Sequence, residues 1–279
     1  MPRSILITGC SSGIGHALAR AFAAHGDLVI ATARRLSSLE SLSPQCQTMA
    51  LDVTSDTSRA ALLEQLAEKG IRHIDILINN AGISAMGPVI ELPAEQLRGQ
   101  FETNVIAPVL LTQALFPLLQ QSQRPLVVNI GSVSGVLTTP FAGAYCASKA
   151  ALHSLSDALR MELAPFGVQV ITVQPGAIQS SFGDSAASGV EAWLGSHSLY
   201  AHIRDGIMAR AQASQVNATA ADDFAATLLT ELNTDQPKAL IRIGKGSRSM
   251  RAVARLLPSE LTRTLLSRKF SLNRLPGIN

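Results

Sequence analysis

The sequence predicts an α/β protein of the doubly wound type, with a central seven-stranded parallel sheet flanked by helices. Seven short apolar segments alternate with helix-period segments through the first 240 of its 279 residues. Most of these apolar segments are rich in Val, Ile and Leu without polar alternation, which is typical of strands buried on both faces of a parallel sheet. A glycine-rich turn between the first strand and the first helix is the third observation, because doubly wound units often open with such a turn.

The expected elements follow one another in chain order. Strands are predicted near residues 4–8, 28–32, 48–51, 74–79, 126–130, 169–173 and 239–243. Helices are predicted over residues 15–24, 58–69, 94–119, 143–164 and 221–232. Residues 180–215 and 244–279 interrupt this rhythm. We expect a single domain over residues 1–243, with 180–215 as a lid over its site, and a basic helical extension over 244–279.

Composition favours a packed globule in the cytoplasm. Hydrophobic residues make up 47% of the chain and charged residues 15%, which argues against disorder. The three cysteines show neither metal-ligand spacing nor a disulfide framework, which indicates a reducing setting. The N-terminus enters an apolar segment without a secretory pattern. The longest apolar stretch, from Val105 to Leu119, is interrupted by Pro108 and Pro117, so we expect no membrane span.

Positive charge is concentrated at the C-terminal end. Residues 1–237 contain 13 basic and 19 acidic residues, whereas residues 238–279 contain 10 basic residues and one acidic residue. The net charge of +3 and the pI near 9.0 therefore reflect the tail, and no nucleic-acid partner is expected.

The turn from Thr8 to Gly15 joins the first expected strand to the first helix. Its glycines allow the backbone to approach a pyrophosphate closely, and the helix N-terminus offers free N–H groups. An ordinary tight turn is the alternative interpretation. The expected cofactor contacts in this turn are Gly9, Ser11, Ser12, Gly13, Ile14 and Gly15.

The end of the second strand carries Arg34 and Arg35 instead of a carboxylate. An acidic residue there favours NAD, whereas a guanidinium can bind the 2′-phosphate of NADP, so we expect NADP(H). Two solvated surface arginines are the alternative. Asp52 and Val53 follow the third strand, where the carboxylate could accept a hydrogen bond from adenine.

A second cluster of candidate residues lies in the middle of the chain. Tyr145 and Lys149 are four residues apart and share one helix face. The lysine charge is expected to lower the pKa of the phenol, which then exchanges a proton with a carbonyl or an alcohol. Ser132 could orient the reacting oxygen, and Asn104 could hold a water linking Lys149 to solvent. Each residue also has an ordinary structural interpretation, as a surface pair, a cap or a buried amide.

Together these motifs resemble the classical short-chain dehydrogenase/reductase family over roughly residues 1–240. A weaker resemblance is to its 17β-hydroxysteroid/retinol dehydrogenase-like branch and to acyl-dihydroxyacetone-phosphate reductases. The residues that carry the resemblance are Thr8 to Gly15, Asn79 to Gly82, Asn104, Ser132, Tyr145 to Lys149, and Pro175 with Gly176.

The resemblance implies a Rossmann fold and a catalytic tetrad of Asn104, Ser132, Tyr145 and Lys149. It also implies a hydrogen bond from Lys149 to the nicotinamide ribose. Further cofactor contacts that it implies are Asn79, Ala81, Gly82, Pro175, Gly176, Ile178 and Ser180. At Gly131 the family commonly has serine, a position outside the tetrad.

These observations predict an NADP(H)-dependent oxidoreductase that interconverts a carbonyl and a secondary or primary alcohol, without a metal. The finer resemblance suggests a lipophilic substrate of steroid, retinoid or acyl-lipid type. In the lid, Phe182 and Trp193 are expected to form apolar substrate walls, or alternatively a local core. The rival function is a non-catalytic NADP(H)-binding redox sensor, against which the complete tetrad argues.

The tail and the long helices suggest two kinds of assembly. In the tail, an apolar helical stripe lies opposite a basic one, so the extension could rest on an anionic membrane surface or pack on the body. The stripes are Met250, Val253, Ala254 and Leu257 against Arg248, Arg251 and Arg255. The helices over 94–119 and 143–164 would form the usual bundle of a homodimer or homotetramer if the resemblance holds.

Overall fold

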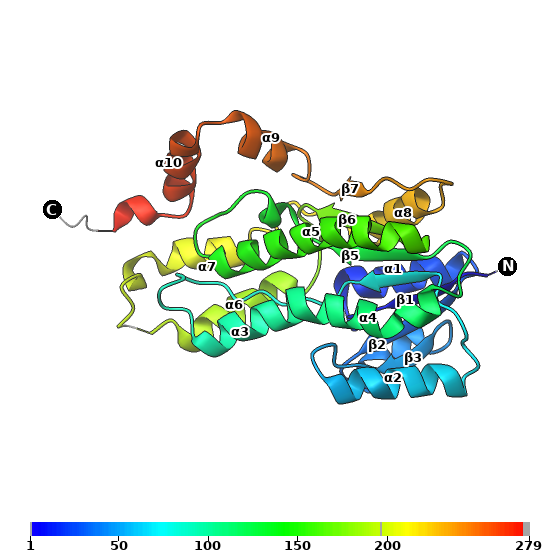
Figure 1. Cartoon of the computed structure of the whole chain (residues 1–279). Coiled ribbons are helices and arrows are strands. Elements are labelled where there is room, and N and C mark those ends of the chain that lie inside the picture. The colour runs from blue at the N-terminus through cyan, green and yellow to red at the C-terminus, as the bar shows by residue number, and fades with distance from the viewer. Residues whose placement is uncertain (1, 196, 276–279) are drawn as a thin grey trace.

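The computed structural model describes residues 2–195 and 197–275, without the side chains of residues 191–193. Its centre is a seven-stranded parallel sheet in the order β3-β2-β1-β4-β5-β6-β7, with helices on both faces (Figure 1). This order confirms the predicted doubly wound Rossmann fold. Every ladder is parallel, so the carboxyl ends of all strands lie along one edge of the sheet.

The predicted strands and helices are present, with ends shifted by a few residues. The strands are β1 Ser4–Ile7, β2 Leu28–Ala33, β3 Gln47–Ala50, β4 Ile76–Asn79, β5 Leu126–Ile130, β6 Gln169–Pro175 and β7 Leu240–Ile243. The helices are α1 Gly13–Ala24, α2 Asp56–Glu68, α3 Ala94–Phe101, α4 Ala107–Leu119, α5 Gly143–Leu163, α6 Phe182–Trp193, α7 Arg204–Gln212, α8 Ala221–Leu232, α9 Ser249–Leu256 and α10 Ser259–Lys269.

Two apolar cores cover the two faces of the sheet. On one face α1 and α8 pack side by side, and their Phe22 and Phe224 are fully buried. On the other face lie α2, α4 and α5, with Leu62 and Leu111 in the core. The central strands are therefore covered on both sides, which explains their unbroken apolar character.

The expected single helix over 94–119 contains a π-helical segment, Glu102–Ile106, between α3 and α4. The two prolines do not end the helix: Pro108 lies in the first turn of α4, where proline is tolerated, and Pro117 lies inside α4 near its C-terminal end. Among the described residues, the combined helix Ala94–Leu119 is long and apolar enough to cross a membrane by length and composition alone. Leu111, Leu115 and Leu119 of this helix are buried against the sheet, as in the core helix of a globular protein.

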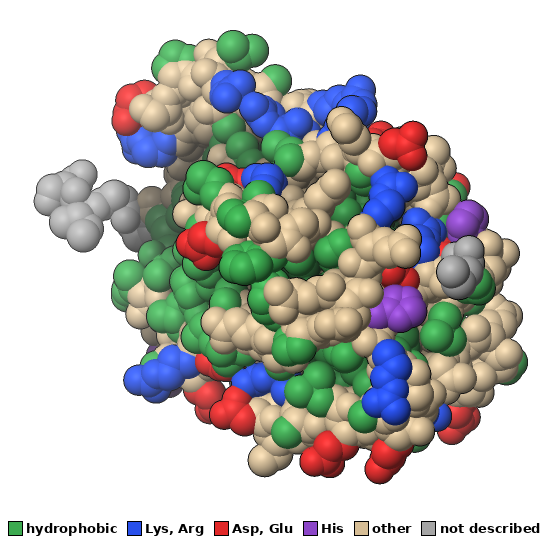
Figure 2. Space-filling view, turned by 45° about the vertical axis from the view of Figure 1, so that its right-hand side comes forward, with side chains coloured by type: hydrophobic (Ala, Val, Ile, Leu, Met, Phe, Trp, Pro, Cys, Tyr) green, Lys and Arg blue, Asp and Glu red, His purple; other side chains and the backbone are tan. Residues whose placement is uncertain are grey.

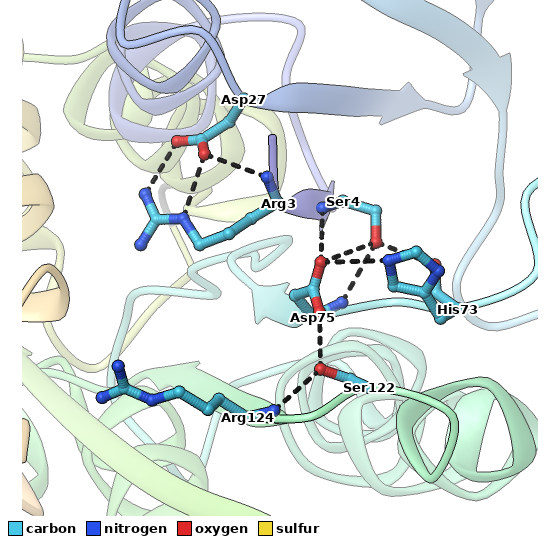
Figure 3. A network of polar contacts seen from close by, with 7 residues as sticks. All are labelled: Arg3, Ser4, Asp27, His73, Asp75, Ser122 and Arg124. Carbon is cyan, nitrogen blue, oxygen red and sulfur yellow. Dashed lines mark hydrogen bonds and ion pairs between the residues drawn. The ribbon is translucent and has the colours of Figure 1, made fainter. Parts of the chain in front are cut away.

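A polar network ties together the strand starts, at the edge of the sheet away from the predicted site (Figure 3). Arg3 donates from Nη2 to Asp27 at 2.8 Å, and the carboxylate of Asp75 accepts from the backbone N–H of Ser4 at 2.7 Å. Asp75 also accepts from the hydroxyl of Ser122 at 2.5 Å. Burial alone would raise the pKa of Asp27, but its hydrogen bonds and ion pair with Arg3 keep that pKa below the usual value.

A third apolar cluster joins the lid to the C-terminal extension. Phe270, which follows α10, is buried with Ile207 of α7 and Val190 of α6. A Cβ atom built on Gly206 would lie 2.3 Å from the carbonyl oxygen of Phe270, so the two segments touch backbone to backbone. Figure 1 shows α9 and α10 rising above the body before the chain returns beside α7. The extension thus packs on the domain.

Candidate active site

The glycine-rich turn has the geometry of a phosphate cradle. Gly9 and Gly13 have φ of +73° and +57°, a backbone region that favours glycine. A Cβ atom built on Gly15 would lie 2.3 Å from the carbonyl oxygen of Gly9, so this position also requires glycine. The turn leads directly into α1, whose first N–H groups are available to an anion. These residues therefore fit the pyrophosphate of a dinucleotide.

A cavity of about 950 Å³ extends from this turn along the carboxyl ends of the strands. It brings together most of the predicted site residues. Those that line it are Gly9, Ser11, Ser12, Gly13, Ile14, Arg34, Asp52, Val53, Ala81, Gly82, Ser132, Tyr145, Lys149, Pro175, Gly176, Ile178, Ser180 and Phe182. The predicted residues that stand behind its wall or outside it are Gly15, Arg35, Asn79 and Asn104.

At the end of β2 the two arginines differ. Arg34 lines the cavity, whereas Arg35 is exposed outside it and precedes the 3-10 segment Leu36–Leu42. The carboxylate of Asp52 accepts from the hydroxyl and the N–H of Thr54, at 2.7 and 3.0 Å. These bonds, followed by the charge of Arg34, lower the pKa of Asp52. Arg34, and not Arg35, therefore lies where it can contact a ligand at the β2 end of the cavity.

After β4, Asn80 supports the glycine turn and Asn79 does not. The side chain of Asn80 donates to the carbonyl oxygens of Thr8 and Gly9, at 2.8 and 3.2 Å. Asn79 is buried on the other side, where its amide donates to Asn129 of β5 at 2.9 Å. The structure therefore gives Asn79, which we predicted as a cofactor contact, a role within the sheet.

Tyr145 and Ser132 meet on the wall of the cavity. Ser132 follows β5, and its hydroxyl accepts from the N–H of Ser134 at 3.1 Å. Tyr145 lies in the first turn of α5, against the ring of Phe182 with the centroids 5.5 Å apart. Burial raises the pKa of Tyr145, although hydrogen bonding from Ser132 and the charge of Arg210 act in the opposite direction.

The expectation that Lys149 lowers the pKa of Tyr145 is wrong for this arrangement. The Nζ of Lys149 donates instead to the carbonyl oxygen of Ile130 at 2.8 Å. Burial lowers the pKa of Lys149 to about 8. The cation that acts on the phenol is Arg210, which we did not single out from the sequence.

Asn104 lies in the π-helical segment and is fully buried behind Lys149. Its side chain accepts from the N–H of Ile83 at 2.9 Å and donates to the hydroxyl of Ser148 at 3.1 Å. A Cβ atom built on Gly82 would lie 3.2 Å from the Oδ1 of Asn104 and 3.7 Å from the Nζ of Lys149. Single π turns inside α-helices are rare, and those that occur are frequently found at functional sites.

Comparisons with known proteins agree with this geometry. The family model described as short chain dehydrogenase matches residues 3–190. The chain belongs to this family. Its members are NAD(P)-dependent oxidoreductases, and the residues predicted as the catalytic tetrad, Asn104, Ser132, Tyr145 and Lys149, lie within the matched range.

Several relatives in the short-chain dehydrogenase family are named for an activity. The chain is 35% identical over 196 residues to an NADPH-dependent 3-dehydrocapnine reductase of Ornithobacterium rhinotracheale, covering 67% of this chain and 69% of the relative. It is 36% identical over 185 residues to the 3-ketodihydrosphingosine reductase of Bacteroides thetaiotaomicron, covering 66% and 67%. A short-chain dehydrogenase from Streptomyces avermitilis has a similar structure, with a TM-score of 0.76, 30% identity and coverage of 100% and 98%.

His153 supports the catalytic loop, and we did not single it out from the sequence. Its ring packs on the loop that carries Ser132, and its Nε2 accepts from the N–H of Ser132 at 3.3 Å. Burial, followed by the charge of Lys149, lowers the pKa of His153 to about 4, so the ring is neutral near pH 7. The sequence feature that could have pointed to a bulky neighbour of this loop is the pair of glycines around Ser132, Gly131 and Gly135.

The lid and the extension both form walls of the site. Leu194 is buried and Tyr200 packs edge-on against Phe141, so part of the lid is a local core. Phe182 lines the cavity, which supports the other interpretation as well, whereas the side chain of Trp193 lies outside the described residues. The extension contributes the apolar side chains Met250, Val253, Leu266 and Phe270, which sequence reasoning had not connected with the dehydrogenase site.

Proposed function

We propose that this protein interconverts a lipophilic carbonyl compound and its alcohol with NADP(H), with Tyr145 as the general acid and base. The observation that carries the proposal is the placement of Tyr145 and Ser132 on the wall of a cavity that also contains the glycine cradle. A single cleft can therefore hold the cofactor and the reacting carbon together.

When it is bound, the nicotinamide supplies or accepts the hydride. The phenol of Tyr145 donates its proton to the carbonyl oxygen, and the hydroxyl of Ser132 donates a hydrogen bond that orients the same oxygen. The raised pKa of Tyr145 keeps the phenol protonated near neutral pH, which suits the direction of reduction. In this proposal Lys149, whose Nζ donates to the carbonyl oxygen of Ile130, also binds the nicotinamide ribose.

The preference for NADP(H) rests on the end of β2. Arg34 lines the cavity there, and a guanidinium matches the oxygens of a 2′-phosphate. The name of the relative that is 35% identical specifies NADPH, which supports the same choice.

The lipophilic substrate rests on the remaining walls of the cavity. Met86, Phe182, Met250, Val253 and Phe270 form an apolar lining beyond Tyr145. The 3-ketodihydrosphingosine reductase among the relatives is named for a ketone of a sphingolipid, in agreement with an apolar pocket.

An activity screen tests the proposal. Purified protein is mixed with NADPH or NADH and a series of 2-alkanones with 4 to 14 carbons, and cofactor oxidation is followed at 340 nm. We expect reduction that is faster with NADPH and with longer chains. Binding of NADPH without turnover of any ketone, or of any alcohol with NADP⁺, would support the redox-sensor alternative.

We further propose that the protein forms homodimers or homotetramers and associates peripherally with membranes on their cytoplasmic side. On α5, Met161 is 71% exposed, and on α9 Leu256 is 79% exposed beside the exposed Arg255. Figure 2 shows basic and apolar side chains together on the lobe formed by the extension. Such a combination suits an anionic lipid surface close to a lipophilic substrate.

A further inference from the structure

The cavity is strongly cationic. Its described lining includes five basic side chains and a single carboxylate. That carboxylate, Asp52, lies at the far end with Arg34, where it is hydrogen-bonded to Thr54. The basic residues of the lining are Arg34, Lys149, Arg210, Lys245 and Lys269. No described acidic residue therefore lines the cavity at the end where Tyr145 lies.

Arg210 is the unusual member of this set. It projects from α7 into the domain, is only 6% exposed, and donates from Nε to the hydroxyl of Thr139 at 2.6 Å. The thiol of Cys146 is a further hydrogen-bonding partner. Within the part of the chain that the structure describes, no carboxylate lies within ion-pair distance of this guanidinium.

Arg59 provides a matched comparison. It is also 6% exposed, but it forms an ion pair with Asp56 and donates to the carbonyl oxygen of Val53. Burying a guanidinium is costly unless an anion compensates it, and arginine stays charged at any physiological pH. Arg59 has its anion within the chain, whereas Arg210 lines a ligand cavity.

The position of Arg210 indicates which ligand brings the anion. The cofactor phosphates belong at the glycine cradle and at Arg34. Arg210 and Tyr145 line the same cavity, and the guanidinium is hydrogen-bonded to Cys146, the residue after Tyr145. The proposed function places the reacting carbonyl at Tyr145.

We propose that Arg210 binds an anionic group of the substrate, a carboxylate, sulfonate or phosphate located a few bonds from the carbonyl that Tyr145 protonates. This inference rests on the proposed function and narrows its substrate class to oxo acids. Planar guanidinium forks match the oxygens of such groups, and the low-polarity surroundings strengthen the contact. The apolar side chains of Met250, Val253, Leu266 and Phe270 would then hold the alkyl chain.

The test uses pairs of probes that differ in charge. The kcat/KM with NADPH is measured for 3-oxododecanoate and for its neutral methyl ester, and acetoacetate serves as a short acid. We expect the wild-type protein to prefer the long acid over its ester by about 30-fold or more, as for a buried charge pair. A similar value for acetoacetate would identify a small oxo acid as the substrate, and a much lower value would identify a lipid.

Substitutions attribute the preference to Arg210. In Arg210→Met the ratio of acid to ester should fall to about one, and Arg210→Lys should keep part of it. An effect of Arg210 on the proton transfer by Tyr145 would change kcat/KM for the acid and the ester alike, so it cancels in the ratio. Arg268→Met, which removes an exposed charge from α10, should leave the ratio unchanged. NADPH binding by each variant, measured by fluorescence, checks that the fold is retained.

Two outcomes would overturn the inference. One is a wild-type protein that reduces the ester, or simple ketones, as efficiently as the acid, which needs no variant at all. The other is a ratio that survives in a folded Arg210→Met protein. Both leave the proposed function intact, because reduction itself continues. Absence of reduction of every acid, ester and ketone would instead contradict the proposed function.

Discussion

The ring of His153 occupies the space that a side chain on Gly131 would need. A Cβ atom built on Gly131 would lie 2.3 Å from the Nε2 of His153. The same ring lies 2.6 Å from a Cβ atom built on Gly135, so the loop carrying Ser132 is fitted against the imidazole on both sides. This contact explains why the chain has glycine where its family commonly has serine.

The fit predicts coupling between the two positions. Gly131→Ala should destabilise the protein by about 1–3 kcal/mol through overpacking and lower kcat by displacing Ser132. The double variant with His153→Ala should recover part of the stability, because the closest clash of the added methyl group, with the imidazole, is then removed, whereas that with the carbonyl oxygen of Val173 at 2.9 Å remains. Denaturant unfolding of the four proteins measures this coupling. Simple addition of the two single effects would contradict the proposed contact.

His153 also makes stability depend on pH. Its pKa in the folded protein is lowered to about 4, below its ordinary value of 6.5. As the pH falls below about 6.5, the unfolded chain binds a proton that the folded protein does not, so stability should be lost between about pH 6.5 and pH 4. A His153→Gln variant should lose less stability over this pH interval than the wild-type protein. An NMR titration of His153 with a midpoint near 6.5 would refute the assignment.

The two arginines after β2 should contribute unequally to cofactor choice. Arg34→Ala should weaken NADPH binding by about 1.5–3 kcal/mol, or roughly 10- to 150-fold, because a charge-assisted bond to the 2′-phosphate is lost. NADH binding should change little. Arg35→Ala is the matched control and should have a small effect, since Arg35 lies outside the cavity. Isothermal titration with both cofactors measures these changes, and equal effects of the two substitutions would argue against the role of Arg34.

Association with membranes should depend on charge in the extension. We expect binding to vesicles that contain anionic lipid, weakened by added salt, as for a basic amphipathic helix. Replacing Arg248 and Arg255 by Glu should abolish the binding while leaving NADPH binding unchanged. Co-sedimentation distinguishes the alternatives: equal retention by neutral vesicles, or no retention by either kind, would exclude this mode of attachment.

The sequence predicted the features that depend on local pattern. Buried strands and the glycine turn are encoded in short segments, so their positions were close to those observed. Side-chain direction between distant segments was harder. The helical pattern of α7 does not reveal that Arg210 lines the same cavity as Tyr145, nor does the amphipathic tail indicate that Phe270 packs on Gly206. Asn79 and Asn80 are adjacent and opposite in direction, so the pattern alone did not separate them.

The environment of Tyr145 was missed for a similar reason. The spacing of Tyr145 and Lys149 places both residues on one helix face, but their burial and the carbonyl of Ile130 come from the tertiary fold. Burial has the largest effect on the phenol, and the pKa of Tyr145 is therefore raised and not lowered.

The most direct test of the proposed chemistry is Tyr145→Phe, assayed with NADPH and a ketone that the wild-type protein reduces. The substitution removes the proton donor and keeps the ring that packs against Phe182. We predict NADPH affinity close to that of the wild-type protein, and a kcat lower by at least about 100-fold. Turnover at a rate similar to the wild-type protein, with NADPH bound, would contradict the role of Tyr145 in proton transfer.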